Sequence, residues 1–513
     1  MLLSLEILKE VLEYLQDDLI SLMSCLLVNR QWSQVAVEVI WKDPWKFQYR
    51  CGNKNAKLEI LSMLISFLPK ESRDILKERD IIIPQIDSPP MYDYVGLCQF
   101  LEFSNVHEMV KIISTSFKCD STDSLNNSNS RSSTLICDSE AYTIYLIKQE
   151  IYKLFINGCP KLKYLSFHDV DAPLPFFEGA ENCFLNLYEL HCDTKLLPGT
   201  LYRMAQICQN LERLIVDECC YDNDGLATLI EVQKKLRYLK IITKGNDDPG
   251  NSRYNRYLRI AGAISTHAQT LTNFIIGGNF IKAIPPVTIA TFENLQTLKI
   301  TFQGKHEDIL KYATFPQLRV LECDRVTSPL DILIGFIGRT GGFIEKISFD
   351  INAVSELSLI PLYNQTIARC CPKIHYLTTW FNYDDVTEFK QVLLACSELQ
   401  HLIVGSYENE DEHYDANLDE FIITLEEIEK ELVSESLNLS RYEFRFIWQA
   451  RFTMLEKYLQ KRKEKCQKPL SLYFSSSFIS SLREDNDIFS KLEQFKNEGL
   501  IKDLEIGEYS EFK

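Results

Sequence analysis

The sequence contains no long uncharged apolar run, either at its start or further along the chain. Its first three residues are apolar, but Glu6, Lys9 and Glu10 follow within the next turns. A secretory signal needs an uncharged apolar core, and a membrane-spanning helix needs about 18 or more consecutive apolar residues. We therefore expect neither kind of segment, and we expect an intracellular protein of the cytoplasm and/or the nucleus.

The short motifs of common catalytic and metal sites are also missing. There are 16 cysteines but no Cys-x-x-Cys pair, and the adjacent pairs at 219–220 and 370–371 have the wrong spacing for chelation by one loop. No phosphate-binding glycine loop, His-Glu-x-x-His or Gly-x-Ser-x-Gly occurs, and the eight histidines are scattered along the chain. We expect no catalytic residues, no cofactor and no metal, and hence a protein that is not an enzyme.

Basic residues are too few to balance the acidic ones. The chain has 55 lysines and arginines against 72 aspartates and glutamates, which gives a formal net charge of −17. Phosphate backbones and anionic lipids repel a chain this acidic. Nucleic acid and membrane surfaces are therefore not expected as partners.

An apolar motif, by contrast, recurs ten times. It places leucine or a similar residue at its first, fourth and sixth positions. Successive motifs begin 25, 24, 25, 35, 24, 23, 26, 30 and 25 residues apart, and most of these intervals match the roughly 20–29 residues of a leucine-rich repeat. The motifs are Leu162-Leu165-Phe167, Leu187-Leu190-Cys192, Leu211-Leu214-Val216, Leu236-Leu239-Ile241, Leu271-Phe274-Ile276, Leu295-Leu298-Ile300, Leu318-Leu321-Cys323, Ile344-Ile347-Phe349, Ile374-Leu377-Thr379 and Leu399-Leu402-Val404.

This spacing predicts a stack of short parallel strands. The second and third apolar residues are two apart, so they share one face of a strand, and the residues between them point to the opposite face. One repeat cannot enclose its own apolar face, and only stacking buries it. We expect an irregular α/β solenoid with a parallel sheet on its concave face. The 35-residue interval holds a turn-rich run at 245–252, which indicates a surface loop.

Four cysteines have a structural explanation in this pattern. Cys159, Cys208, Cys371 and Cys396 each stand three residues before the first apolar position of a repeat. A small apolar side chain that returns at one structural position favours packing over metal binding.

The first residues predict a helix with two apolar stripes. One stripe consists of Leu5, Leu8, Leu12 and Leu15, and a second one lies beside it. One stripe can close the core of a small helical module, and the other needs a second partner. A unit of about forty residues has little core of its own.

The same region resembles an F-box over residues 2 to about 45. The matching features are the opening helix, Asp18-Leu19, the segment from Leu27 to Trp32 that reads Leu-Val-Asn-Arg-Gln-Trp, and the closing Ile40-Trp41. Ser4 stands where the family usually has proline, and serine can cap a helix. Together with the repeats, the chain resembles an F-box/leucine-rich-repeat protein, a group that is expanded in some fungi.

The resemblance implies a substrate receptor of a Skp–cullin–F-box ubiquitin ligase. Its partners would be the Skp adaptor, through it a cullin, and a protein substrate bound by the repeats. The alternative is a repeat-containing interaction scaffold in which the helical module only caps the solenoid. The residues expected on the adaptor are Leu3, Ser4, Ile7, Leu8, Val11, Leu19, Leu22, Val28 and Trp32.

We expect six segments. They are the helical module (1–48), a helical linker or cap (49–116), a Ser/Asn-rich loop (117–140), the repeats (141–407), an acidic segment (408–440), and a C-terminal helix with capping strands (441–513). The C-terminal helix is expected from residue 441 to 465, and the capping strands around residues 470–474 and 504–506.

Substrate recognition is expected on the concave face, where aromatic and arginine side chains commonly carry interface energy. Outward positions are the second, fourth and sixth after each first apolar residue, and Trp380 is the first of them to mutate. For any single residue, an ordinary solvated strand position is the alternative. The candidates are Tyr164, His168, Arg213, Tyr238, Lys240, Lys299, Tyr376, Trp380 and His401.

Overall fold

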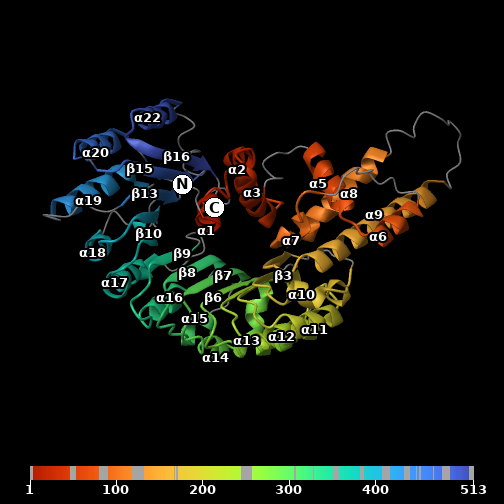
Figure 1. Cartoon of the computed structure of the whole chain (residues 1–513). Coiled ribbons are helices and arrows are strands. Elements are labelled where there is room, and N and C mark those ends of the chain that lie inside the picture. The colour runs from red at the N-terminus through yellow and green to blue at the C-terminus, as the bar shows by residue number, and fades with distance from the viewer. Residues whose placement is uncertain are drawn as a thin grey trace. The chain divides into compact units, whose positions relative to one another are not determined.

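The computed structural model describes residues 4–46, 54–79, 90–117, 132–166, 168, 172–243, 257–304, 308–326, 329–349, 357–381, 386–406, 416–431, 439–445, 448–449, 452–465, 467–475 and 486–507. Figure 1 shows the helices and strands of the chain, coloured from red at the N-terminus to blue at the C-terminus. The chain divides into two compact units, Met1–Arg237 and Tyr238–Lys513. Each unit is described by itself. Within the described residues, no helix is both long enough and apolar enough to cross a membrane.

The first unit begins with a three-helix module that closes its own core. Each helix starts at a side chain that accepts a backbone N–H from the first turn, namely Ser4, Asp18 and Asn29. Ser4 thus caps the first helix, as its position predicted. The helices are α1 (Leu5–Glu13), α2 (Leu19–Leu26) and α3 (Arg30–Lys42). The buried core consists of Leu8, Leu12, Leu22, Cys25, Val35, Ala36 and Val39.

Parallel strands and return helices form the rest of the first unit. Strands β1, β2, β3 and β4 are hydrogen-bonded in this order. In register across the strands lie Leu101, Leu165, Leu190 and Leu214, all fully buried. The elements are α5 (Lys54–Ser66), α6 (Lys70–Lys77), α7 (Tyr94–Leu97), β1 (Phe100–Glu102), α8 (Phe103–Phe117), α9 (Ser132–Gly158), β2 (Tyr164–Ser166), η1 (Leu174–Phe176), α10 (Ala180–Phe184), β3 (Glu189–Asp193), α11 (Pro198–Ile207), β4 (Arg213–Glu218) and α12 (Asp224–Glu231).

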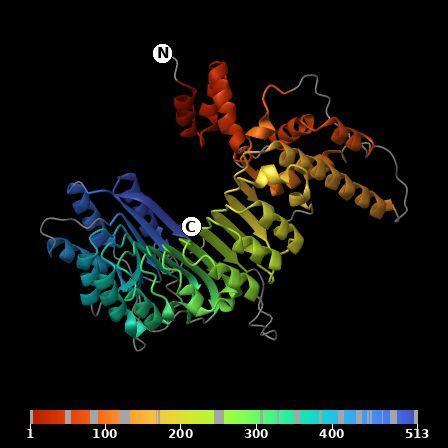
Figure 2. The same ribbon diagram turned by 60° about the horizontal axis from the view of Figure 1, so that its bottom comes forward.

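The second unit continues with the same kind of repeat, and its helices lie on one face of the strands (Figure 2). Its first six strands are β5 (Tyr238–Ile242), β6 (Asn273–Gly277), β7 (Thr297–Gly304), β8 (Val320–Val326), β9 (Lys346–Phe349) and β10 (Tyr376–Phe381). The helices between them are α13 (Leu258–Ser265), η2 (Gly278–Ala283), α14 (Pro286–Ile289), α15 (Asp308–Tyr312), α16 (Leu330–Ile337), η4 (Leu357–Leu359) and α17 (Ile360–Cys370).

The parallel ladder extends beyond the ten motifs toward the end of the chain. After β10 follow α18 (Thr387–Ala395), β11 (His401–Ser406), β12 (Ala416–Asn417), α19 (Leu418–Glu431), β13 (Arg441–Arg445), β14 (Trp448–Gln449), α20 (Phe452–Glu464), β15 (Leu470–Ser475), α22 (Asn486–Asn497) and β16 (Ile501–Gly507). Strands β11, β13, β15 and β16 pair in parallel. These registers, with those of β5 to β11, confirm the predicted α/β leucine-rich-repeat fold.

The recurring cysteines connect neighbouring repeats. Cys208 and Cys396 follow the last residues of α11 and α18, and both are buried. The Cys208 thiol lies 3.3 Å from the carbonyl oxygen of Phe184, which occupies the same position one repeat earlier. Cys396 repeats this contact with the carbonyl of Cys371 at 3.6 Å. The packing role predicted for these cysteines is therefore confirmed.

The structure corrects the expected C-terminal helix. Residues 441–445 form β13, and the helix α20 begins only at Phe452. Tyr442 and Phe444 lie within the range predicted to be helical, but both are buried at strand positions in register with Leu402 and Val404. The predicted capping strands are confirmed as β15 and β16. The turn-rich run at 245–252 and most of the Ser/Asn-rich loop lie outside the described residues.

Candidate functional site

The three-helix module keeps a large apolar surface outside its closed core. On α1, Ile7 is 51% exposed and Val11 is 45% exposed, whereas Leu8 and Leu12 on the other stripe are fully buried. Tyr14, at the end of the same helix, is 90% exposed. The helix therefore has the two apolar stripes that the sequence predicted, and only one of them has a partner within the described chain.

The predicted adaptor residues fall into two groups. Ser4, Ile7, Val11 and Val28 are exposed. The expectation was wrong for Leu8 and Leu22, because both are fully buried in the core of the module and cannot contact another protein.

Two further predicted adaptor residues have an intermediate position. Leu19 and Trp32 are partly buried and pack against the core of the module. Leu3 lies outside the described residues.

Further exposed apolar residues on α2 were missed in the sequence. Ile20 is 81% exposed and Met23 is 51% exposed, and Leu27, directly after the helix, is 88% exposed. A helical signal was present, because Ile20, Met23 and Leu27 are three and four residues apart and share one face. The module therefore carries exposed apolar side chains on a second helix as well as on α1.

The residues predicted for substrate recognition are mostly accessible. All except one are partly exposed on the strands or directly after them: Tyr164, His168, Arg213, Tyr238, Lys240, Lys299, Tyr376 and His401. They belong to different units, since Tyr164, His168 and Arg213 precede residue 238 and the other five do not.

Trp380 is the exception, and the expectation of an outward position was wrong. It is only 1% exposed, and its ring lies 5.2 Å from Phe349 and 5.8 Å from Tyr363, measured between centroids. The preceding core position carries the small Thr379, and the large indole packs against the core aromatics there. Trp380 therefore stabilises the repeat and offers no surface to a partner.

A connected row of polar and aromatic side chains crosses the second unit. The Glu322 carboxylate accepts hydrogen bonds from Lys299 at 2.6 Å and from Lys346 at 2.8 Å. The Lys346 ammonium also lies 4.3 Å from the centre of the Tyr376 ring, and Tyr376 meets the edge of His401 at 4.1 Å. These contacts hold Lys346 and Tyr376 in fixed orientations at partly exposed positions. Fixed side chains lose less conformational entropy when a partner binds.

The row continues onto β13 and β15. His401 Nε2 lies 3.6 Å from the carboxylate of Glu443, which is almost fully buried. Arg441 stacks on the Tyr473 ring at 3.6 Å. Burial lowers the pKa of His401, and the Arg441 charge lowers it further, against the opposing effect of Glu443. His401 is therefore neutral at physiological pH, and its contact with Tyr376 is one between two uncharged rings.

The first unit carries a second polar group on β2, β3 and β4. The Tyr164 ring lies 4.9 Å from His191, and His191 Nε2 lies 2.7 Å from the Glu189 carboxylate. Arg213 donates to the other oxygen of Glu189 at 2.8 Å. Burial would raise the pKa of Glu189, but His191 and Arg213 outweigh it and hold that pKa below its usual value.

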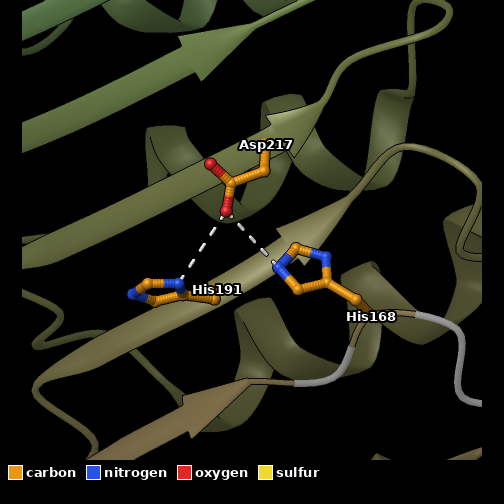
Figure 3. Close-up of side chains that lie close together, drawn as sticks. All are labelled: His168, His191 and Asp217. Atoms are coloured by element: carbon orange, nitrogen blue, oxygen red, sulfur yellow. Dashed lines mark ion pairs between the residues drawn. The ribbon is translucent and has the colours of Figure 1, made fainter. Parts of the chain in front are cut away.

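His168, His191 and Asp217 come together from three successive repeats (Figure 3). His168 Nε2 is 3.5 Å and His191 Nδ1 is 3.9 Å from the same oxygen of Asp217. The interpretation of the histidines as scattered was therefore wrong for these two. They are 23 residues apart in the sequence, and only the pairing of β3 beside β2 and β4 brings them to one place.

The carboxylates around His168 change its titration. Burial by itself would lower the pKa of His168, but Asp193 and Asp217 outweigh this effect and raise it to about 9. The imidazole is therefore protonated at neutral pH in this arrangement. It forms ion pairs with both carboxylates, at 3.6 Å and 3.5 Å.

Comparison with known proteins gives likenesses among solved structures only. No protein-family model and no curated protein matches the sequence. A crystal structure of the mouse RP105/MD-1 complex is 13% identical over 67% of this chain, with a TM-score of 0.38, and the chain spans 60% of that protein's length. The leucine-rich repeat-containing protein LegL7 from Legionella pneumophila is 13% identical over 55% of this chain and 85% of its own, with a TM-score of 0.27. The fold assignment rests on the chain's own repeat spacing and strand register.

Proposed function

We propose that this chain is the substrate-recognition subunit of a Skp–cullin–F-box ubiquitin ligase. The three-helix module binds the Skp adaptor, and the repeats bind the protein that is to be ubiquitinated. The observation that carries the proposal is the exposed apolar surface on α1 and α2, next to a core that the module has already closed.

This apolar surface is larger than a cap on the repeats needs. Fully burying one isoleucine or valine side chain contributes about 1.5–3 kcal/mol. Ile7, Val11 and Leu27 each expose 45% or more of their surface. Large exposed apolar side chains that gather on one small module favour a protein interaction site.

Ion pairs frame the same helix and hold it in place. Lys9 lies 3.3 Å from Glu38, and Lys42 lies 3.7 Å from Glu13, so the middle and the C-terminal end of α1 are tied to α3. Each of these pairs is partly exposed and contributes little to stability by itself. The ion pairs instead keep the exposed stripe of α1 in one orientation. They also place charged residues beside apolar ones, and protein interfaces commonly have an apolar centre with a polar rim.

The repeats supply the second half of the proposed function. Lys346, Tyr376 and Arg441 are held by neighbouring side chains on one partly exposed face of the strands. Pre-oriented aromatic and arginine side chains lower the entropic cost of binding. We assign substrate capture to this face and no catalytic step to the chain. In a ligase, the receptor raises the effective concentration of substrate lysines near the conjugating enzyme.

A pull-down of the full chain on a panel of purified Skp adaptors tests the proposal. The double variant Ile7→Asp with Val11→Asp places two charges on the exposed stripe and leaves the core residues unchanged. We expect the wild type to bind and the double variant to lose at least about 90% of the capture, because two buried charges each cost several kcal/mol.

A matched control is Leu185→Asp with Leu362→Asp. Both leucines are about half exposed on the repeats, so the control adds the same charge away from the module. It should bind the adaptor like the wild type, and circular dichroism should show that both double variants are folded. If the wild type binds no adaptor, the ligase role is wrong, and the alternative of a protein-interaction scaffold takes its place.

A further inference from the structure

His168, His191 and Asp217 have the geometry of a metal-binding group on the first unit. The three ligand atoms all lie within 4.8 Å of one another. Their side chains keep between 20% and 36% of their surface exposed, so an ion in solution can reach them. Two nitrogen ligands around a metal at 2.0–2.1 Å are about 3.3 Å apart in a tetrahedral site, so small side-chain rotations bring these atoms into range.

A second observation concerns the other nitrogen of each histidine. His168 Nδ1 faces the Asp193 carboxylate at 3.6 Å, and His191 Nε2 lies 2.7 Å from Glu189. In metal-binding histidines, the second ring N–H almost always donates a hydrogen bond to a carboxylate or carbonyl, which fixes the tautomer and the ring orientation. Here both histidines have such a carboxylate, and both remaining nitrogens turn toward Asp217 (Figure 3).

The supporting carboxylates are themselves anchored. The Asp193 carboxylate accepts the backbone N–H groups of Lys195 at 2.7 Å and Leu196 at 3.3 Å through one oxygen, and its other oxygen faces His168. Glu189 is held by Arg213 at 2.8 Å. The outer shell is therefore built from the local fold and does not depend on an ion.

We propose that His168, His191 and Asp217 bind one divalent transition-metal ion, with zinc as the best match. Imidazole nitrogen suits zinc and its transition-metal neighbours, whereas calcium and magnesium prefer oxygen ligands throughout. Three protein ligands leave one position for water or for a side chain of a bound protein. The ion would join three adjacent repeats, and its binding would release the proton that His168 carries while it faces Asp217. This proposal is independent of the ligase role.

Calorimetric titration of the chelator-treated full chain with zinc tests the site. We expect the wild type to bind one zinc ion per chain. In each of His168→Gln and His191→Gln, the zinc affinity should fall by about tenfold or more. Glu189→Gln, which changes only the outer shell, should weaken binding by about tenfold. His375→Gln is the control, because this partly exposed histidine of the second unit lies 3.1 Å from Glu398, outside the proposed site, and the variant should bind zinc like the wild type.

Two results would overturn the site. One is a wild type that takes up no zinc at micromolar concentrations, and the other is unchanged binding in both His168→Gln and His191→Gln. If a variant fails to fold, the absorption spectrum of the cobalt-substituted wild type decides instead. Nitrogen and oxygen ligation supports the site, whereas a strong thiolate charge-transfer band would place the ion on cysteines and reject it.

Discussion

Trp380 and Tyr376 stand on the same strand, but the structure gives them different roles. Trp380 is 1% exposed between Phe349 and Tyr363, whereas Tyr376 is partly exposed between Lys346 and His401. The sequence predicted surface positions for both, because strict alternation along a strand places even-numbered offsets on one face. Alternation fails from Thr378 onward, where four consecutive residues up to Phe381 are all buried.

The first prediction separates these two aromatic residues. Trp380→Ala should lower the free energy of unfolding by about 3–5 kcal/mol, because it empties a packed aromatic core site. Tyr376→Ala should cost about 1–2 kcal/mol, since it loses only a cation–π contact and an edge contact at a partly exposed position. Urea denaturation followed by circular dichroism measures both values. A Trp380→Ala protein as stable as Tyr376→Ala would contradict the buried placement.

The spacing of the apolar motif does not predict which polar side chains of neighbouring strands lie close together. His168 and Asp217 stand at the sixth position after their first apolar residues, and His191 stands at the fourth. In the structure, Asp193 pairs with Glu218 and skips Asp217, which marks an irregularity at the end of β3 and β4. Such an irregularity changes the direction in which side chains point, and the apolar motif does not predict it.

At the scale of elements, the apolar motif predicted ten strands that the structure confirms, β2 to β11. It missed β1 because Cys98 and Phe103 replace leucines around Leu101, and it missed β13 because Tyr442 stands at a leucine position. Both strands are in register with neighbouring repeats. A motif without cysteine at its first position or tyrosine at its fourth thus misses these two strands.

The second prediction concerns the ion pairs that join three strands. Burial alone would raise the pKa of Glu322, but Lys299 and Lys346 outweigh it and lower that pKa below its usual value. A lowered carboxyl pKa stabilises the fold above the unfolded-state pKa of about 4.3, and this contribution disappears as pH falls through the lower folded-state value.

Glu322→Gln should therefore be less stable than the wild type at pH 7, by about 0.5–1 kcal/mol because the carboxylate is partly exposed. The difference should shrink when urea unfolding is repeated near pH 3. Glu293→Gln, at an exposed position before β7, should match the wild type at both pH values. An equal loss for Glu322→Gln at both pH values would show that the lysine pairs do not stabilise the strands.

At the scale of the whole molecule, the chain combines a three-helix module that has exposed apolar side chains with repeats that carry connected polar and aromatic side chains. The sequence predicted two apolar stripes on α1 but wrongly expected Leu8 to contact the adaptor; Leu8 is buried in the core, and Ile7 and Val11 remain exposed. It could not assign Leu22 to the core or Leu27 to the surface, since helical spacing alone does not say which stripe faces inward. Only the packing of α2 on α3 decides that.

The central claim is that the chain binds an adaptor through its first two helices. Hydrogen–deuterium exchange of the full chain, with and without a purified Skp adaptor, measures this contact in place. We predict slower exchange across residues 5–28 in the complex, with unchanged exchange in the helices of the repeats. A complex that leaves residues 5–28 unprotected, or the absence of any complex, would contradict the claim.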